Sequence, residues 1–208
     1  AAPLIPMIST GVAGSAICRK LRENGYHNLL TPKKCELDYL DLNETIRWFE
    51  QNNPDAVIVA AAKVGGILAN KSNPADFILE NIKIQTNIIE TSWKKNVKKL
   101  IFLGSSCIYP KSSAQPIDEE SLLTGPLEKT NESYAIAKIA GIKLCNALRT
   151  QYQFNAISLM PTNLYGPGDN YDENSSHVLA AFIQRFYNAK HQSLSSVICW
   201  GSGKPYRE

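Results

Sequence analysis

Long apolar runs, clustered cysteines and a strong net charge are all missing from this chain of 208 residues. Without a run of about 18 apolar residues, the sequence offers no segment that would form a membrane-spanning helix. The first residues, Ala1-Ala2-Pro3-Leu4, lack a basic segment ahead of an apolar stretch, so they do not predict a signal peptide. A net charge of +3 is too small to indicate binding to nucleic acid or to an anionic membrane.

The five cysteines are scattered along the chain, and no two of them form a C-x-x-C pair. An odd number of cysteines without that spacing argues against a disulfide framework and against a zinc site. We therefore expect no bound metal and a reducing, cytoplasmic setting. The composition, 44% hydrophobic and 20% charged, is typical of a globular protein.

Helical and strand-like patterns alternate from Gly11 to about Cys199. Such alternation predicts an α/β fold with a doubly wound, mostly parallel sheet of the Rossmann type. The segment 56–62 is a continuous apolar run, as expected of a strand covered by helices on both faces. The expected helices are 14–24, 42–52, 76–96, 134–152 and 178–189, and the expected strands are 28–30, 56–62, 100–104, 156–160 and 196–200.

Both ends of the chain depart from the pattern of a regular Rossmann fold. Pro3 and Pro6 stand where the first central strand belongs, and proline cannot donate a hydrogen bond to a neighbouring strand. We therefore expect that strand to be irregular or missing. The chain stops at Glu208, directly after a strand-like segment, and we expect it to be truncated there.

Two glycines precede the first expected helix and could form part of a loop that binds the pyrophosphate of a dinucleotide. Gly11 and Gly14 would let the ligand approach the backbone, and the helix N-terminus would attract its negative charge. A complete G-x-x-G-x-x-G pattern would need glycine at position 8, where the chain has Ile8. An ordinary turn at the start of a helix explains the two glycines about as well.

Two lysines follow the second expected strand, at the point where Rossmann folds bind the adenosine ribose. Lys33 and Lys34 would suit the 2′-phosphate that distinguishes NADP from NAD. They would equally suit a solvent-exposed loop, and both interpretations stay open.

The most specific chemistry in the sequence is a tyrosine and a lysine four residues apart. On a helix, Tyr134 and Lys138 share one face, and a lysine ammonium beside a phenol lowers the pKa of the phenol. Tyr134 would then exchange a proton with the oxygen of a carbonyl or an alcohol. Ser105 would hydrogen-bond the same oxygen, and Cys107 adds a further acid or base. This set of residues indicates the active site of a short-chain dehydrogenase/reductase.

Six longer motifs indicate a narrower family: AAAKVGGI at 60–67, GSSCIYP at 104–110, YAIAKIAG at 134–141, MPTNLYGP at 160–167, NSSHV at 174–178 and WGSGKP at 200–205. Together they resemble the GDP-L-fucose synthases, which are extended short-chain dehydrogenases/reductases. The resemblance runs from about Gly11 to Glu208. It implies an NADP-binding Rossmann-like domain over 1–165 and the start of a smaller substrate-binding lobe over 166–208. The implied reaction uses NADP(H) and converts GDP-4-keto-6-deoxy-D-mannose to GDP-L-fucose by epimerising C3 and C5 and then reducing C4.

The resemblance also implies a role for each residue of the site. Tyr134 would protonate the C4 oxygen, Lys138 would lower the tyrosine pKa and hold the nicotinamide ribose, and Ser105 would polarise the keto group. Cys107 and His177 would be the epimerisation pair, one removing a proton and the other returning it on the opposite face. The expected cofactor-binding residues are Gly11, Gly14, Lys34, Leu103, Gly104, Ser105, Ser106, Lys138, Pro161, Thr162, Asn163, Leu164 and His177, and those expected to bind the GDP-sugar are Arg185, Trp200 and Arg207.

Helices 76–96 and 134–152 bear on assembly. In this superfamily the equivalent helices pair across a two-fold axis into a four-helix bundle, so the resemblance implies a homodimer. The apolar faces of the two helices would equally belong to the core of one chain.

Each single residue also has a purely structural interpretation. Cys107 would be a small buried side chain, and His177 would be a residue at the start of a helix. Arg185 would be a surface charge, and Trp200 would be part of the core.

The family carries an arginine near position 10, where this chain has Thr10. Together with the bulk of Ile8, that difference predicts weaker NADPH binding. Two alternatives for the whole protein follow. One is another nucleotide-sugar epimerase, dehydratase or reductase of the same superfamily, and the other is a non-catalytic, truncated paralogue.

Overall fold

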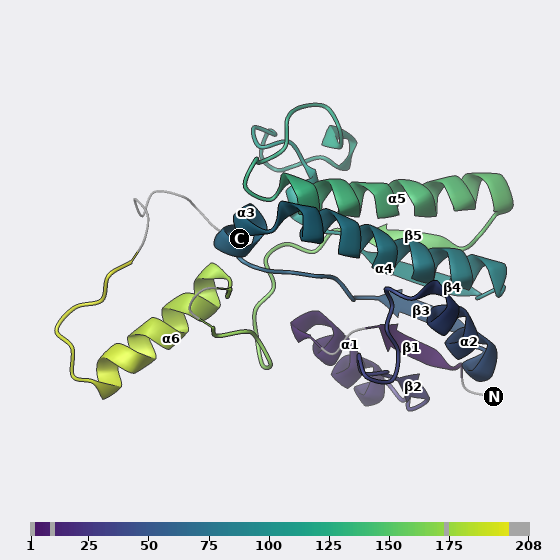
Figure 1. The fold of residues 1–208 in the computed structure, drawn as a ribbon, viewed down its shortest axis with the longest axis horizontal. Helices are drawn as coiled ribbons and strands as arrows, with labels where there is room; N and C mark the ends of the chain where they lie inside the picture. The colour runs from purple at the N-terminus through teal and green to yellow at the C-terminus, as the bar shows by residue number, and fades with distance from the viewer. Residues whose placement is uncertain (1–2, 9–10, 173–174, 200–208) are drawn as a thin grey trace.

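The computed structural model describes residues 3–8, 11–172 and 175–199. Within that part of the chain, parallel strands form one five-stranded sheet in the order β2-β1-β3-β4-β5 (Figure 1). The strands are β1 (Ile5–Ile8), β2 (Leu29–Leu30), β3 (Ala56–Val59), β4 (Lys99–Leu103) and β5 (Ala156–Leu159). The predicted α/β fold with a parallel sheet is confirmed.

All five predicted helices are present, with ends that differ from the predicted ends by a few residues. They are α1 (Val12–Glu23), α2 (Leu42–Asn52), α4 (Pro74–Lys94), α5 (Glu132–Tyr152) and α6 (Val178–His191). The sequence did not predict α3 (Ile67–Ser72), because six residues are too few to show a helical repeat of apolar side chains. Two short 3₁₀ helices follow β4, η1 (Ser106–Ile108) and η2 (Glu119–Ser121).

The expectation that the first strand is irregular is wrong. β1 is the second strand of the sheet, although Pro6 lies inside it. The N–H of Ile5 donates to the carbonyl of Asn28 at 3.0 Å, and Met7 pairs with Ile58 of β3. Pro6 withholds one donor, and the bonds made by its neighbours keep the strand in place.

The strand predicted at 196–200 is also wrong over residues 196–199, which are not in a strand. Ile198 there is 81% exposed, so its apolar side chain has no surface to pack against. Residue 200 lies outside the described residues.

Helices cover both faces of the sheet, as a doubly wound fold requires (Figure 1). Alternate residues of β3 point to opposite faces: Val57 and Val59 belong to one core and Ile58 to another. The first core is large, and α2, α4 and α5 all contribute to it. The second is small, and of the described helices only α1 contributes to it, with Cys18 as its buried residue there.

The helix ends follow from local chemistry. The carboxylate of Asp41 accepts hydrogen bonds from the N–H groups of Asn43 (2.7 Å) and Glu44 (3.0 Å), which starts α2. Asn53 ends that helix with a left-handed φ of 44°. Pro74 opens α4, at a position where the helix needs no N–H donor.

Close packing sets the place of α5 on the sheet. Gly141 allows it, because a Cβ there would lie 2.6 Å from Cζ of Phe102 in β4 and 2.9 Å from the side chain of Gln85 in α4. The amide of Gln85 also donates to the carbonyl of Ala137. The Tyr134 and Lys138 end of α5 is thereby held over the carboxyl end of β4.

Candidate active site

Lys138 is the most deeply buried charged residue of the predicted site, with 3% of its surface exposed. Its ammonium donates to the carbonyl of Leu103, the last residue of β4, at 2.8 Å. The same ammonium lies 4.8 Å from the ring centre of Phe102. Burial lowers the pKa of Lys138 to about 8, and the nearby Cys107 acts in the opposite direction. The lysine is therefore still mostly charged at neutral pH.

The prediction that Lys138 lowers the pKa of Tyr134 is wrong for this structure. Burial raises the pKa of Tyr134 well above its ordinary value, and the Cys107 thiolate, once formed, raises it further. The ammonium of Lys138 is bonded to Leu103 and lies 5.8 Å from the centre of the tyrosine ring. Tyr134 is thus a protonated phenol at neutral pH, which suits a proton donor.

Cys107 stands beside the same tyrosine and lysine, in the short helix η1. Its thiol is half-buried, and burial raises its pKa, while the Ser105 hydroxyl and the charge of Lys138 lower it. Burial therefore works against a role of Cys107 as a base, because the loss of water outweighs the two favourable neighbours. Ser105 also starts η1, where its oxygen accepts from the N–H of Cys107 at 3.4 Å.

Backbone hydrogen bonds join the loops that follow β4 and β5. Gly104 N–H donates to the carbonyl of Leu159 at 2.8 Å, and Ser106 N–H donates to that of Pro161 at 3.2 Å. Gly104 is buried, and a Cβ there would lie 3.2 Å from both Met160 Sδ and an Ile142 methyl. The predicted cofactor residues Leu103, Gly104, Ser105 and Ser106 therefore lie beside the predicted Pro161, Thr162, Asn163 and Leu164, of which the last three are exposed.

The predicted phosphate loop joins β1 to α1. Gly11 is the residue that precedes α1, Gly14 is buried in its first turn, and that turn carries no acidic residue. Ile8 is the last residue of β1, paired with Val59, and so it belongs to the strand rather than to the loop. Thr10 lies outside the described residues. A helix N-terminus free of acidic side chains, at the carboxyl end of a central strand, fits the pyrophosphate of a dinucleotide.

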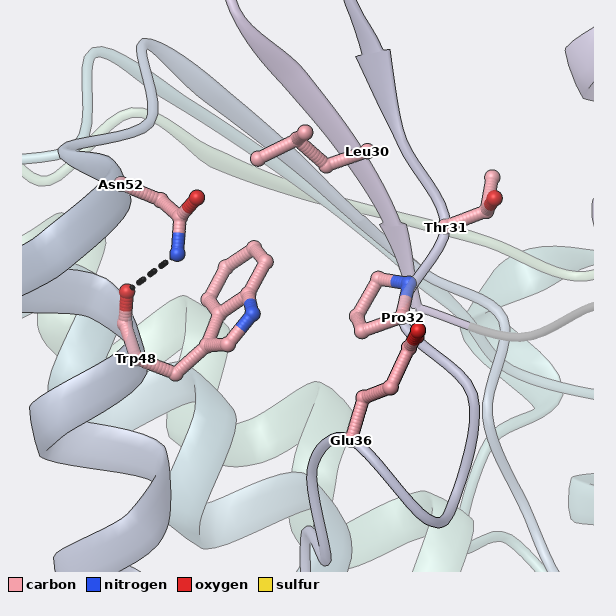
Figure 2. A pocket seen from close by; sticks show the side chains of 6 residues that line it. All are labelled: Leu30, Thr31, Pro32, Glu36, Trp48 and Asn52. Atoms are coloured by element: carbon pink, nitrogen blue, oxygen red, sulfur yellow. Dashed lines mark hydrogen bonds between the residues drawn. The ribbon is translucent and has the colours of Figure 1, made fainter.

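Lys34 lies exposed in the loop after β2. A hollow of about 380 Å³ adjoins that loop, with the Trp48 indole on one side and the Pro32 ring on the other (Figure 2). Its remaining lining residues are Leu30, Thr31, Glu36 and Asn52, so Lys34 does not line it. Tyr134 and Lys138 do not line it either, and the hollow is separate from the residues that carry acid–base chemistry.

The other predicted residues fall on or beyond α6. His177 immediately precedes α6 and is exposed, and among the described residues no hydrogen bond or ion pair joins it to Cys107 or Tyr134. Arg185 donates to the carbonyl of Ile198 at 3.0 Å, which ties the segment after α6 back to the helix. Trp200 and Arg207 lie outside the described residues.

The sequence predicted no role for Gly66 or Asn81, although Gly66 belongs to one of the six motifs.

Among the described residues, no group of three histidine, cysteine, aspartate or glutamate side chains could hold a metal ion. No described helix combines the length and the apolar character that crossing a membrane requires.

Comparison with known proteins gives a consistent result. The model of the NAD dependent epimerase/dehydratase family matches residues 9–208. GDP-L-fucose synthase 1 of Arabidopsis thaliana is 56% identical over 198 residues, a match that covers 95% of this chain and 61% of that protein. The chain thus spans about three fifths of the length of this curated relative.

Two solved structures are similar over nearly all of the chain. A GDP-L-fucose synthetase of Naegleria fowleri bound to NADP superposes with a TM-score of 0.87 at 29% identity, covering 100% of this chain and 68% of that one. A GDP-mannoheptose C4 reductase of Campylobacter jejuni with NADP bound gives 0.84 at 36% identity, covering 93% of this chain and 58% of that one.

Proposed function

This chain belongs to the NAD dependent epimerase/dehydratase family, and on that premise we propose that it carries the active site of an NADPH-dependent epimerase/reductase. The substrate would be GDP-4-keto-6-deoxy-D-mannose and the product GDP-L-fucose. The observation that carries the proposal is the grouping of Ser105, Cys107, Tyr134 and Lys138 around the carboxyl end of β4. Relatives that are 51% to 56% identical and named GDP-L-fucose synthase support the choice of substrate.

In the reductive step, the protein supplies a proton to the C4 oxygen. When bound, NADPH supplies the hydride. Tyr134 is the proton donor, because burial keeps its phenol protonated. Lys138 orients the nicotinamide ribose, and Ser105 hydrogen-bonds the keto oxygen.

In the epimerising steps, one group removes a proton from C3 or C5 and another returns it on the opposite face. We assign these tasks to Cys107 and His177. Only the thiolate of Cys107 can act as a base. Burial raises the pKa of this thiol and so disfavours the thiolate, whereas Ser105 and Lys138 favour it. His177 has to approach from the α6 side of the site.

The remaining residues of the site are proposed from the same resemblance. Residues 1–165 would form the NADP-binding domain and 166–208 part of the substrate lobe. The GDP-sugar would contact Arg185, Trp200 and Arg207. A homodimer through a bundle of α4 and α5 is proposed, as is a cytoplasmic location, which the five free cysteines support. The cofactor would contact Gly11, Gly14, Lys34, Leu103, Gly104, Ser105, Ser106, Lys138, Pro161, Thr162, Asn163, Leu164 and His177.

A second function has a specific observation in its favour. His177 is exposed, so the second group that epimerisation needs is not enclosed with Ser105, Tyr134 and Lys138 in this structure. A GDP-sugar C4 reductase that needs no epimerisation would require only Ser105, Tyr134 and Lys138. The structural similarity to a GDP-mannoheptose C4 reductase fits that function.

The first test is a titration of NADPH into the 208-residue chain, followed by fluorescence or calorimetry. We expect saturable binding that Lys34→Ala weakens and Lys190→Ala, an exposed lysine on α6, leaves unchanged. A folded chain that binds no NADPH would favour the non-catalytic paralogue instead.

The second test separates epimerase from reductase in the full-length protein that carries this sequence. The epimerase is expected to incorporate solvent deuterium at C3 and C5 of the substrate. Cys107→Ser should stop that incorporation, whereas Cys35→Ser, an exposed cysteine, should not. A wild-type protein that reduces a GDP-4-keto sugar without incorporating deuterium would favour the reductase.

A further inference from the structure

The loop that follows β3 is fixed by one side chain of α4. Asn81 is 2% exposed, and its amide oxygen accepts from the N–H of Lys63 at 2.8 Å. Its amide nitrogen donates to the carbonyls of Lys63 at 3.0 Å and Phe77 at 2.7 Å. The loop is therefore held on both its donor and its acceptor side, in the way that a neighbouring strand would hold it.

Two ion pairs add to this hold. The Lys63 ammonium lies 2.6 Å from the carboxylate of Glu80 and 3.4 Å from that of Asp76, both on α4. Asn70 closes the other side of the loop, because its buried amide donates to the carbonyls of Gly65 and Gly66. Residues 63–66 are thus a fixed platform at the carboxyl end of β3.

A segment from a distant part of the sequence sits on this platform. Gly66 N–H donates to the carbonyl of Ser175 at 3.0 Å. A Cβ at Gly66 would lie 2.9 Å from the carbonyl oxygen of Ser176 and 3.6 Å from that of Ser175. The contact is backbone against backbone, so no rotation of a side chain could make room for a methyl group. The next residue along the chain is His177, which immediately precedes α6.

We propose that Gly66 is a positioning residue for His177, which sets the placement of the proposed epimerisation group against the sheet. This inference rests on the proposed function. His177 is exposed and directly follows the docked residues 175 and 176, so its position depends on where those two residues are held. Glycine is required for space and not for backbone conformation, since φ at Gly66 is −64°.

The neighbouring glycine provides a matched control. A Cβ at Gly65 would meet Ala69 at 2.9 Å and Phe77 at 3.1 Å, both on the helices beneath the loop, and its contacts do not include residues 175 and 176. Gly65→Ala and Gly66→Ala therefore place the same methyl group on adjacent residues, but only Gly66→Ala presses on the docked segment.

The docking is tested in the 208-residue chain by amide hydrogen exchange. Gly66→Ala is expected to speed exchange at 175–180, while Gly65→Ala leaves that segment near the wild-type rate and speeds exchange at 67–72. Equal rates at 175–180 in the wild type and Gly66→Ala would overturn the docking. This measurement needs no catalytic activity.

The positioning role is tested in the full-length protein by deuterium incorporation at C3 and C5, with NADPH affinity as the second readout. Gly66→Ala is expected to slow incorporation roughly 10-fold to 100-fold, since displacements near 1 Å have effects of that order. Its NADPH dissociation constant should rise by far less than incorporation slows, because His177 is one of thirteen proposed cofactor contacts and the other twelve lie outside residues 175–180. Loss of NADPH binding in step with incorporation would reduce Gly66 to a folding role. A wild-type protein without incorporation would overturn the proposed function, while hydrogen exchange would still decide the docking.

Discussion

α5 and α6 differ sharply in how they are held, although each carries a group that the proposed reaction needs. α5 buries eight residues, Lys138 among them, between the sheet and α4. α6 buries two residues, Ala180 and Ala189, and stands beside the body formed by the sheet and its helices (Figure 1). Its large exposed apolar residues are Val178, Leu179, Ile183, Phe186 and Tyr187.

The difference separates the proposed active site into two parts. The residues for reduction lie on elements that the large core holds in place, so their geometry is preorganised. His177 and Arg185 lie on an element with few buried contacts, which belongs to the part of a protein that opens most readily. Hydride transfer would thus use a rigid site, and epimerisation would depend on where α6 is placed.

The largest expected effect comes from removing the proton donor of the rigid part. Tyr134→Phe in the full-length protein should lower the rate of C4 reduction by about 10²-fold to 10⁴-fold. Deuterium incorporation at C3 and C5 should continue, because it uses other groups. Tyr109→Phe, a half-buried tyrosine on the loop after β4, is the control. If Tyr134→Phe lost both C4 reduction and deuterium incorporation, the proposed division between a reducing part and an epimerising part of the site would be wrong.

The next prediction concerns the stability of the fold, which depends on pH through the buried ammonium of Lys138. The folded pKa is about 8 and the ordinary value is 10.5, so between these values the unfolded chain binds more protons than the folded one. Stability contributed by this site therefore rises as the pH increases from 8 to 10.5, and below pH 8 the cost of burying the charge is complete.

Lys138→Met should remove that dependence. At pH 7 the variant is expected to be more stable than the wild type by about 1 to 3 kcal/mol, and the difference should disappear towards pH 10.5. Urea unfolding at several pH values measures both trends. Lys143→Met, an exposed lysine of α5, is the matched control and should show neither. A constant difference across the pH range would mean that the charge of Lys138 costs the fold nothing.

A smaller loss of stability is expected from a change in the packing of α5, which can be compared with a change on α6. Gly141→Ala should lower the free energy of unfolding by about 1 to 3 kcal/mol, because the methyl group would press on Phe102 and Gln85. Chemical unfolding monitored by tryptophan fluorescence measures the loss. Full stability in Gly141→Ala would show that α5 can move away from β4, and the contrast with α6 would be weaker.

The smallest change in the free energy of unfolding is expected from a substitution on α6. Phe186 is 54% exposed, so Phe186→Ser should change the free energy of unfolding by less than about 0.5 kcal/mol. The same unfolding experiment measures it, with Phe49→Ser, a fully buried residue of α2, as the contrasting variant. A large loss of stability in Phe186→Ser would mean that its ring is covered in solution.

The fold was predictable from periodicity where elements are long and buried. The apolar run 56–62 predicts β3, which ends three residues earlier at Val59, and the repeat within 134–152 predicts α5 to within two residues. Pro6 and Ile198 misled the prediction in opposite directions: a strand tolerates one missing donor if its neighbours are paired, and a strand-like pattern forms no strand without a partner. Local sequence does not contain either fact.

The site was predictable in its residue types but not in its electrostatics. The spacing of Tyr134 and Lys138 gives their common face, yet the carbonyl of Leu103 that binds the ammonium comes from another element. For the same reason, spacing could not reveal how far burial shifts the pKa of Cys107. The docking of Ser175 on Gly66 joins residues 109 positions apart, and no local sequence pattern predicts a contact over that separation.

The unequal covering of the sheet has a thermodynamic consequence. Among the described helices, only α1 covers one face, over a small core in which Ile5, Cys18 and Ile58 are the buried residues. A dinucleotide seated at the N-terminus of α1 would link that helix to β1, and at a hundred times its dissociation constant it would add about 2.7 kcal/mol to the free energy of unfolding. The melting temperature then becomes a gauge of cofactor occupancy. In a cell depleted of cofactor, that added stability would be lost and the chain would be more susceptible to proteolysis.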